Sequence, residues 1–175
     1  MIGVSIKGDM SEILSHLRSI GPNVDKAASA AINRAAEATR TVARRKIAKD
    51  TSYPQAVVGQ RMAVRRSNPS TLRAEVIAYP FAPNIGKFGR PAQNRTGTAA
   101  TAWATRKTYK SAFRYKGTDR VVSRVGKERF PLKGLKGPSV RKQFMRPETI
   151  AEMDARAITV FRERFRHELN RRGAY

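Results

Sequence analysis

The chain has 175 residues, of which 40% are hydrophobic and 28% charged, so its composition fits a folded protein rather than a disordered one. Its 36 Lys and Arg residues stand against 13 Asp and Glu, and the formal net charge is +23. Self-repulsion of this size destabilises a compact state unless a polyanion screens it, so the charge indicates a polyanionic partner. The sequence contains no cysteine, which excludes disulfides, thiol catalysis and thiolate metal sites.

The sequence also bears on export and membrane insertion. The residues that follow Met1 contain no apolar core of signal-peptide length, and no apolar run of about 18 uncharged residues occurs anywhere. We therefore expect a soluble protein that is not exported and that has no membrane partner.

In chain order, the first predicted elements are a short strand and a short helix. The β-branched residues of segment 2–6 favour a strand, and Asp9 with Glu12 forms a variant of the helix-capping pattern. Gly21-Pro22 ends this first helix.

A longer helix is predicted from about residue 24 to residue 50. Alanine dominates its apolar face, which favours the helical state and allows a neighbouring element to approach closely. The predicted face consists of Val24, Ala27, Ala28, Ala31, Ile32, Ala35, Val42 and Ile47.

The middle of the chain, residues 51–127, has short apolar runs interrupted by Pro, Gly, Asn and Ser, a pattern typical of strands and turns. Runs 62–64 and 72–77 predict two antiparallel strands with a turn at 68–70 between them. Segments 110–116 and 120–125 predict a second hairpin.

Segment 80–108 is rich in proline, glycine and small residues, and it is predicted to be a long loop. A loop of this length in a compact domain is usually functional or becomes ordered on a partner. We expect it to become ordered only in an assembly.

The last predicted element is a helix over residues 147–172. Acids occupy its first turns and arginines its last turns, as the helix dipole favours. Its predicted core stripe is Ile150, Met153, Ala157, Val160, Phe161, Phe165 and Leu169. The predicted fold is therefore α+β, with two long amphipathic helices packed on a small, mostly antiparallel sheet and a long basic loop in the middle. We expect a single domain over residues 1–175, helical over 8–50, β-rich over 51–137 and ending in the helix.

More than half of the net positive charge lies in residues 51–127, which contain 15 basic residues and only two acidic ones. Neutralising DNA phosphates with such residues releases counterions and adds strongly to affinity. The alternative role of these basic residues is to form interface salt bridges with acidic neighbouring proteins. The residues predicted to face DNA or a partner are Arg61, Arg65, Arg66, Lys87, Arg90, Arg95, Arg106, Lys107, Lys110, Arg114 and Lys116.

Three aromatic residues interleave with these cations: Tyr109, Phe113 and Tyr115. They could stack on bases, but aromatic residues at alternate positions are more often the buried face of a strand. No zinc-finger spacing or other recognition motif accompanies the basic residues, so sequence-specific readout is not expected.

The sequence contains no motif that indicates catalysis or cofactor binding. His16 and His167 are the only histidines, and neither has the spacing of a metal site. The acids of residues 148–154 are explained by their position at the start of a helix. We therefore expect no enzyme, no metal and no cofactor, and a nuclease or toxin is disfavoured.

Segment 27–36, Ala-Ala-Ser-Ala-Ala-Ile-Asn-Arg-Ala-Ala, resembles the N-terminal helix of the phage minor tail protein Z family, also called neck or tail-completion proteins. The likeness continues through Val42-Ala43-Arg44-Arg45, the basic middle, Gly126 to Leu132 and the C-terminal helix. Its most distinctive part is the Ala-Ile-Asn-Arg core.

This resemblance implies a structural subunit of the connector that joins a phage head to its tail. Such a subunit is expected to form a ring, six-fold in symmetry, around the channel that carries genomic DNA. Its expected neighbours are head-completion and tail-terminator proteins, and its expected location is the head-tail junction of the virion after assembly in the host cytoplasm. A free nucleic-acid-binding protein, nucleoid- or ribosome-associated, is the alternative.

Overall fold

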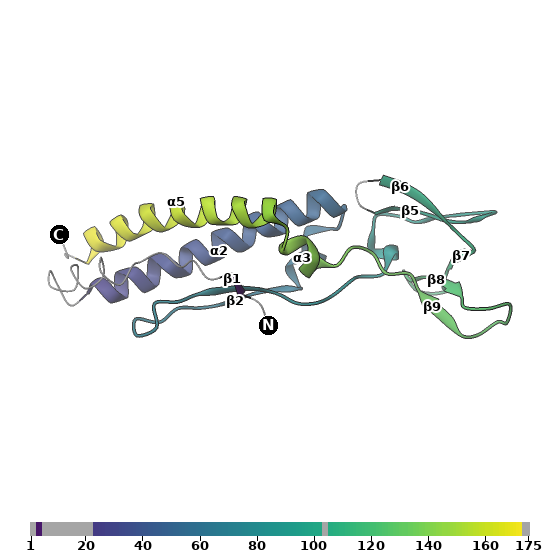
Figure 1. The fold of residues 1–175 in the computed structure, drawn as a ribbon, viewed down its shortest axis with the longest axis horizontal. Helices are drawn as coiled ribbons and strands as arrows, with labels where there is room; N and C mark the ends of the chain where they lie inside the picture. Colours follow the sequence, from purple (N-terminus) through teal and green to yellow (C-terminus); the bar gives the residue numbers. More distant parts are fainter. Residues whose placement is uncertain (1–2, 5–22, 103–104, 173–175) are drawn as a thin grey trace. The chain divides into compact units, whose positions relative to one another are not determined.

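The computed structural model describes residues 3–4, 23–102 and 105–172 (Figure 1). The chain divides into two compact units. We call residues 1–43, 62–78 and 147–175 the helical unit, and residues 44–61 and 79–146 the two-sheet unit. The expectation of a single domain over residues 1–175 stays a prediction, and the helix expected near residues 9–20 lies outside the described residues.

The helical unit is built on two long helices that lie side by side, α2 (Val24–Thr51), whose last turns belong to the two-sheet unit, and α5 (Pro147–Arg171) (Figure 1). The first turns of α2 pack on the end of α5, where Val24, Ala27 and Ala28 form one buried cluster with Leu169. Small alanine side chains bring the two helices together, as their pattern predicted.

The sheet of this unit has the strand order β1-β3-β2 and is antiparallel. The strands are β1 (Gly3–Val4), β2 (Met62–Arg65) and β3 (Glu75–Ala78). The predicted hairpin is confirmed, with Met62 opposite Ala78 and Arg65 opposite Glu75.

The side chain of Asn33, in the Ala-Ile-Asn-Arg core, links α2 to the segment after β2 by two hydrogen bonds. Its Nδ2 donates to the Ser67 carbonyl at 3.0 Å, and its Oδ1 accepts from the Ser67 amide at 2.7 Å. Asn33→Ala is expected to lower the free energy of unfolding by about 1–3 kcal/mol, because Ser67 is buried and its peptide groups would lose their partners. Urea unfolding measures this loss, and the exposed Asn170→Ala is the matched control. Equal losses in the two variants would contradict this role of Asn33.

The two-sheet unit contains two antiparallel sheets, with strand orders β4-β5-β6 and β7-β8-β9. Their strands are β4 (Ala92–Asn94), β5 (Gly97–Ala102), β6 (Thr105–Lys110), β7 (Ala112–Arg114), β8 (Val121–Arg124) and β9 (Leu132–Gly134). The unit also holds the short helices α3 (Gln55–Gly59) and α4 (Val140–Phe144) and the 3-10 turn η1 (Ile85–Lys87). The α+β class is thus confirmed, but the described residues form three small sheets where one was expected.

The prediction of a loop over residues 80–108 is wrong for its second half, which forms β4, β5 and most of β6. The small residues that suggested a loop are those of β5, where Ala99, Ala100 and Ala102 are all buried. A strand covered on both faces has room for small side chains only, so packing overrides the low strand propensity of alanine.

The segment before β4 is held by Asn84 and Tyr53. Asn84 Nδ2 donates to the Val121 carbonyl and its Oδ1 accepts from the Val121 amide, both at 2.8 Å. Tyr53 stacks on Phe88 with 3.9 Å between ring centroids, and its hydroxyl donates to the Pro138 carbonyl at 3.0 Å. Burial raises the pKa of Tyr53, with a smaller contribution from Tyr109, so this hydroxyl stays protonated as a donor.

Gly86 occupies a position where no side chain fits. A Cβ there would lie 1.6 Å from the Asp119 carbonyl oxygen, a backbone atom of the turn between β7 and β8. Gly86→Ala is therefore expected to displace η1 from this turn and to cost about 1–3 kcal/mol, as overpacking does. Thermal unfolding measures the loss, with Gly126→Ala as the control because a Cβ at Gly126 meets nothing within 4 Å. A destabilisation by Gly126→Ala as large as that by Gly86→Ala would contradict the assignment.

Candidate nucleic-acid interface

Charge divides unequally between the two units. The two-sheet unit carries 22 Lys and Arg against three Asp and Glu, a formal net charge of +19, whereas the helical unit carries 14 against 10, a net charge of +4. Most of the net positive charge of the chain therefore lies in the two-sheet unit.

In the helical unit, the acids hold many of the cations in ion pairs. Glu75 in β3 contacts Arg65 at 3.1 Å and Arg73 at 2.8 Å. Glu37 contacts Arg66 at 3.6 Å. Glu168 contacts Arg171 at 2.8 Å, and the hydrogen bond from Arg171 lowers the pKa of this carboxyl. Most of the charge of this unit is balanced inside it.

Arg65 and Arg66, both predicted to face DNA or a partner, are two of these paired residues, and they lie in the helical unit. The other nine predicted residues lie in the two-sheet unit. Of these nine, Arg61 covers the Phe81 ring at 3.8 Å, and Lys87 reaches Asp119 at 3.8 Å. An exposed pair of this kind contributes little and is easily exchanged for a phosphate.

Strand β6 presents the densest group of predicted cations. Arg106, Lys107 and Lys110 are all exposed, and none forms an ion pair among the described residues. Side chains alternate along a strand, so Arg106 and Lys110 project from one face of the sheet and Lys107 from the other. Because β6 is the edge of its sheet, this charge also blocks unwanted pairing with another strand.

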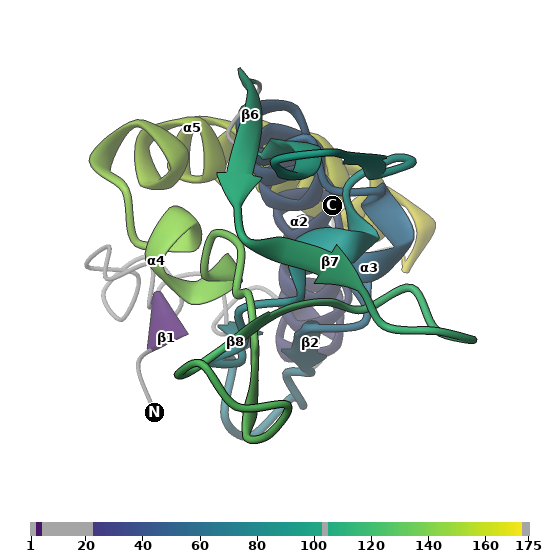
Figure 2. The same cartoon turned by 90° about the vertical axis from the view of Figure 1, so that its right-hand side faces the viewer.

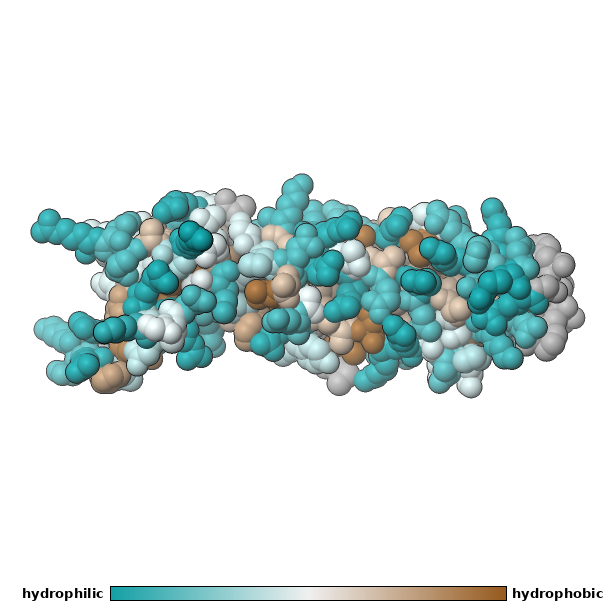
Figure 3. Space-filling view, turned by 180° about the vertical axis from the view of Figure 1, so that it is seen from behind, coloured by the Kyte–Doolittle hydropathy of each residue, from teal (hydrophilic) through white to brown (hydrophobic). Residues whose placement is uncertain are grey.

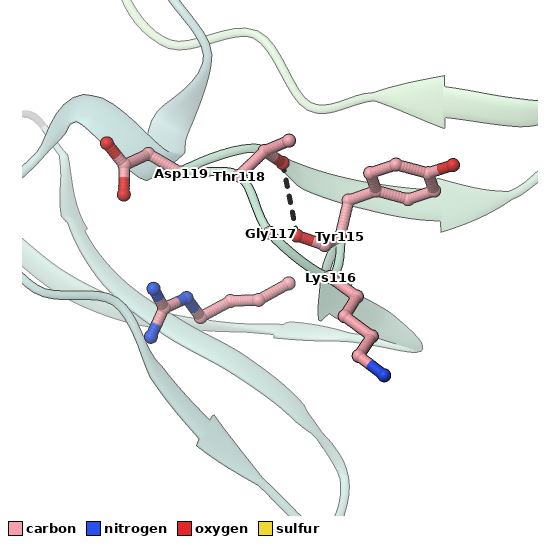
Figure 4. A pocket seen from close by; sticks show the side chains of 6 residues that line it. Tyr115, Lys116, Gly117, Thr118 and Asp119 are labelled. Atoms are coloured by element: carbon pink, nitrogen blue, oxygen red, sulfur yellow. Dashed lines mark hydrogen bonds between the residues drawn. The ribbon is translucent and has the colours of Figure 1, made fainter.

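A second group lies in the turn that connects β7 to β8, residues 115–120, directly after β6 and β7 (Figure 2). Figure 4 shows the shallow pocket that this turn forms, with the Lys116 side chain extending outward. The turn is fixed by its own hydrogen bonds: Thr118 Oγ1 donates to the Tyr115 carbonyl at 3.1 Å, and the Tyr115 amide donates to the Arg120 carbonyl at 2.8 Å. Lys116 therefore lies on an ordered turn, directly after Arg114 at the end of β7.

The two groups belong to connected sheets. Gln93 Oε1 in β4 accepts from the Arg114 amide at 3.2 Å, and Thr98 Oγ1 in β5 donates to the Ala112 carbonyl at 2.9 Å. These bonds tie β7 to the sheet that carries β6. The remaining predicted residues, Arg90 and Arg95, are exposed before and after β4.

Sequence reasoning left several exposed cations of this unit out of the predicted set, among them Arg120, Arg124 and Lys133. Arg120 lies in the same turn as Lys116, and the hairpin predicted around Gly117 already contained the signal for it. Lys133 lies opposite Ser123 in β9, and no strand was predicted there.

The three aromatic residues do not form one buried strand face. Tyr109 and Phe113 are half-buried, and Tyr115 is 44% exposed in the turn. The Arg124 guanidinium lies 5.8 Å from the centre of the Phe113 ring. Of the three, Tyr115 is the most exposed and the best placed to contact a ligand.

Other kinds of site are not evident in the described part of the chain. Hydrophilic side chains cover most of the face seen in Figure 3, and hydrophobic residues form small separate patches. No described helix is long and apolar enough to cross a membrane. Among the described residues, no group of His, Cys, Asp and Glu is arranged to hold a metal ion. The expectation of no cofactor and no enzymatic activity stays a prediction.

The fold and the charge define a strongly basic α+β protein whose cations concentrate in one unit. The model of the prophage minor tail protein Z (GPZ) family matches residues 6–172, nearly the whole chain. The chain therefore belongs to this family and is a structural protein of the phage tail, found in the virion. No curated protein and no solved structure matches it.

Proposed function

We propose that this tail protein is a tail-completion subunit that forms a ring at the head-tail junction, around the channel through which genomic DNA passes. The observation that carries the proposal is the net charge of +19 on the two-sheet unit, with exposed cations on β6 and on the β7–β8 turn that no acid of the described chain neutralises. A polyanion is the partner that makes such a surface favourable.

The proposed contact with DNA is independent of sequence. Lys and Arg side chains on an edge strand and a turn meet phosphates, which position a duplex but carry no base information. Diffuse contacts of this kind also let DNA slide past, as a channel requires. The proposed role is structural and needs no catalysis, and the proposed neighbours are the head-completion and tail-terminator proteins.

Ring formation gives each copy the same two contact surfaces. A head-to-tail contact that closes on itself produces a cyclic oligomer, and we propose six-fold symmetry for it. Several copies would then surround the DNA with their two-sheet units, so that each phosphate contact is weak and the sum is strong.

Light scattering and negative-stain microscopy of the purified protein test this function, with and without tails or capsids of the same phage. Closed rings, or end-on binding to those particles, are the expected result. A persistent monomer that ignores the particles and binds free nucleic acid with a steep salt dependence would contradict the proposal and favour a free nucleic-acid-binding protein.

A further inference from the structure

The loop between β8 and β9, residues 125–131, exposes two large apolar side chains. Val125 is 64% exposed and Phe130 is 60% exposed, more than any other large hydrophobic residue in the described part of the chain. The Val125 amide donates to the Pro131 carbonyl at 3.2 Å, so the loop closes and both side chains lie at one hairpin end. We call residues 125–131 the β8–β9 loop.

The cations around this apolar tip define what could cover it. Lys127 and Arg129 lie within the loop on either side of Glu128, so the loop has a net charge of +1. The Arg129 guanidinium is 5.7 Å from the centre of the Phe130 ring. Double-stranded DNA offers phosphates to these cations but no unstacked base to Phe130. An occupant that satisfies both features is a protein surface that is apolar and acidic.

The first half of α5 presents such a surface. Ala151, Ala155 and Ile158 are exposed and spaced so that they share one face of the helix, with Ile158 46% exposed. Glu148 and Glu152, also exposed, lie beside them. Residues 148–158 hold three acids and one cation, Arg156, so this stretch has a net negative charge in a chain of net charge +23.

We propose that the β8–β9 loop of one copy docks on the exposed face of α5, residues 148–158, of a second copy. Val125 and Phe130 pack against the Ala151, Ala155 and Ile158 stripe, and the loop cations face the carboxylates beside it. Copies with a net charge of +23 repel one another, so a contact between them must join local surfaces of opposite charge.

The two surfaces of this contact differ, so it is heterologous and can repeat from copy to copy until a ring closes. The inference thus rests on the ring of the proposed function and identifies the subunit contact that forms it.

A charge exchange between copies tests the contact. Variant one is Lys127→Glu with Arg129→Glu, and variant two is Glu148→Lys with Glu152→Lys. Each variant alone is expected to self-associate at least about tenfold more weakly than the wild type, because its loop and α5 carry like charges. An equimolar mixture of the two is expected to regain assembly, since each loop then meets an α5 of opposite charge. Sedimentation velocity of the full-length chains, after circular dichroism has verified folding, measures both results.

Two controls separate this contact from general effects. Lys142→Glu with Arg146→Glu changes the net charge as much as variant one, at exposed positions in and after α4, and is expected to assemble normally. Phe130→Ser is expected to weaken assembly without a charge change, whereas Tyr79→Ser, at a side chain 49% exposed, is expected to have no effect.

The outcomes distinguish this contact from the ring itself. A wild type that assembles while both charge variants also assemble would overturn the contact and leave the ring intact. A mixture that fails to regain assembly would overturn it too. A wild type that is monomeric at every concentration would overturn both the contact and the ring.

Discussion

Replacement of four cations of the two-sheet unit by glutamine is expected to weaken binding to duplex DNA by about three and a half orders of magnitude near 0.1 M salt. The four are Arg106, Lys107, Lys110 and Arg114. Each neutralised phosphate releases about 0.9 of a counterion, which corresponds to roughly eightfold in affinity per contact at that salt concentration. The logarithmic slope of affinity against salt should therefore become shallower by about 3.6.

Fluorescence anisotropy titrations over a series of salt concentrations measure the affinity and the slope together. The matched control removes four exposed cations of α5 in the helical unit, which are Arg156, Arg162, Arg164 and Arg166. It changes the net charge equally, and we expect it to retain most of the affinity. If both quadruple variants lost affinity to the same extent, binding would depend on net charge alone and not on the two-sheet unit.

Tyr53→Ala is expected to lower the free energy of unfolding of the two-sheet unit by about 3–5 kcal/mol, the range for removing a buried aromatic side chain. Tyr53 is 3% exposed, and its ring supports Phe88, whose own side chain is 1% exposed. Removal of the ring leaves a cavity beneath the segment that leads into β4 and deprives the Pro138 carbonyl of its donor.

Urea unfolding followed by circular dichroism measures this change. Tyr53→Phe is the graded variant, since it keeps the ring and removes only the hydroxyl, and it is expected to cost about 0.5–1.5 kcal/mol. A Tyr53→Phe loss as large as that of Tyr53→Ala would mean that the hydrogen bond, and not the packing, holds this segment.

The sequence predicted the long helices well because their signals are local. The alanine face of α2 has a helical period, and Val24, Ala27, Ala28, Ala31 and Ile47 are all buried as expected. The helix over 147–172 ends one residue earlier, at Arg171. Both helices are long enough for periodicity to outweigh single exceptions.

Apart from the strand expected at residues 2–6, where β1 lies, the β structure was predicted only where a turn marked it. In the β2–β3 and β7–β8 hairpins, typical turn residues connect the two strands. Strand β5, in contrast, is a run of Ala, Thr and Gly whose composition is typical of a loop. Its strand state depends on burial on both faces, which a single sequence does not reveal. The five-residue helices α3 and α4 are too short for a period to be visible.

The number of basic residues could be read from the sequence. Their distribution between the two units could not be predicted from it. Arg65 and Arg66 look the same in sequence as Arg106 and Lys107. The first two meet Glu75 and Glu37, which are distant in the chain, whereas the second two have no such partner among the described residues. Tertiary folding therefore decides which cations have a carboxylate partner and which have none among the described residues.

The most direct test of the central claim, that the two-sheet unit faces the DNA, is photocrosslinking in assembled particles. A photoreactive amino acid at Lys110 in β6 is expected to crosslink to genomic DNA, whereas the same amino acid at Arg162 in α5 is not. Crosslinking to DNA at Arg162, with none at Lys110, would contradict the account.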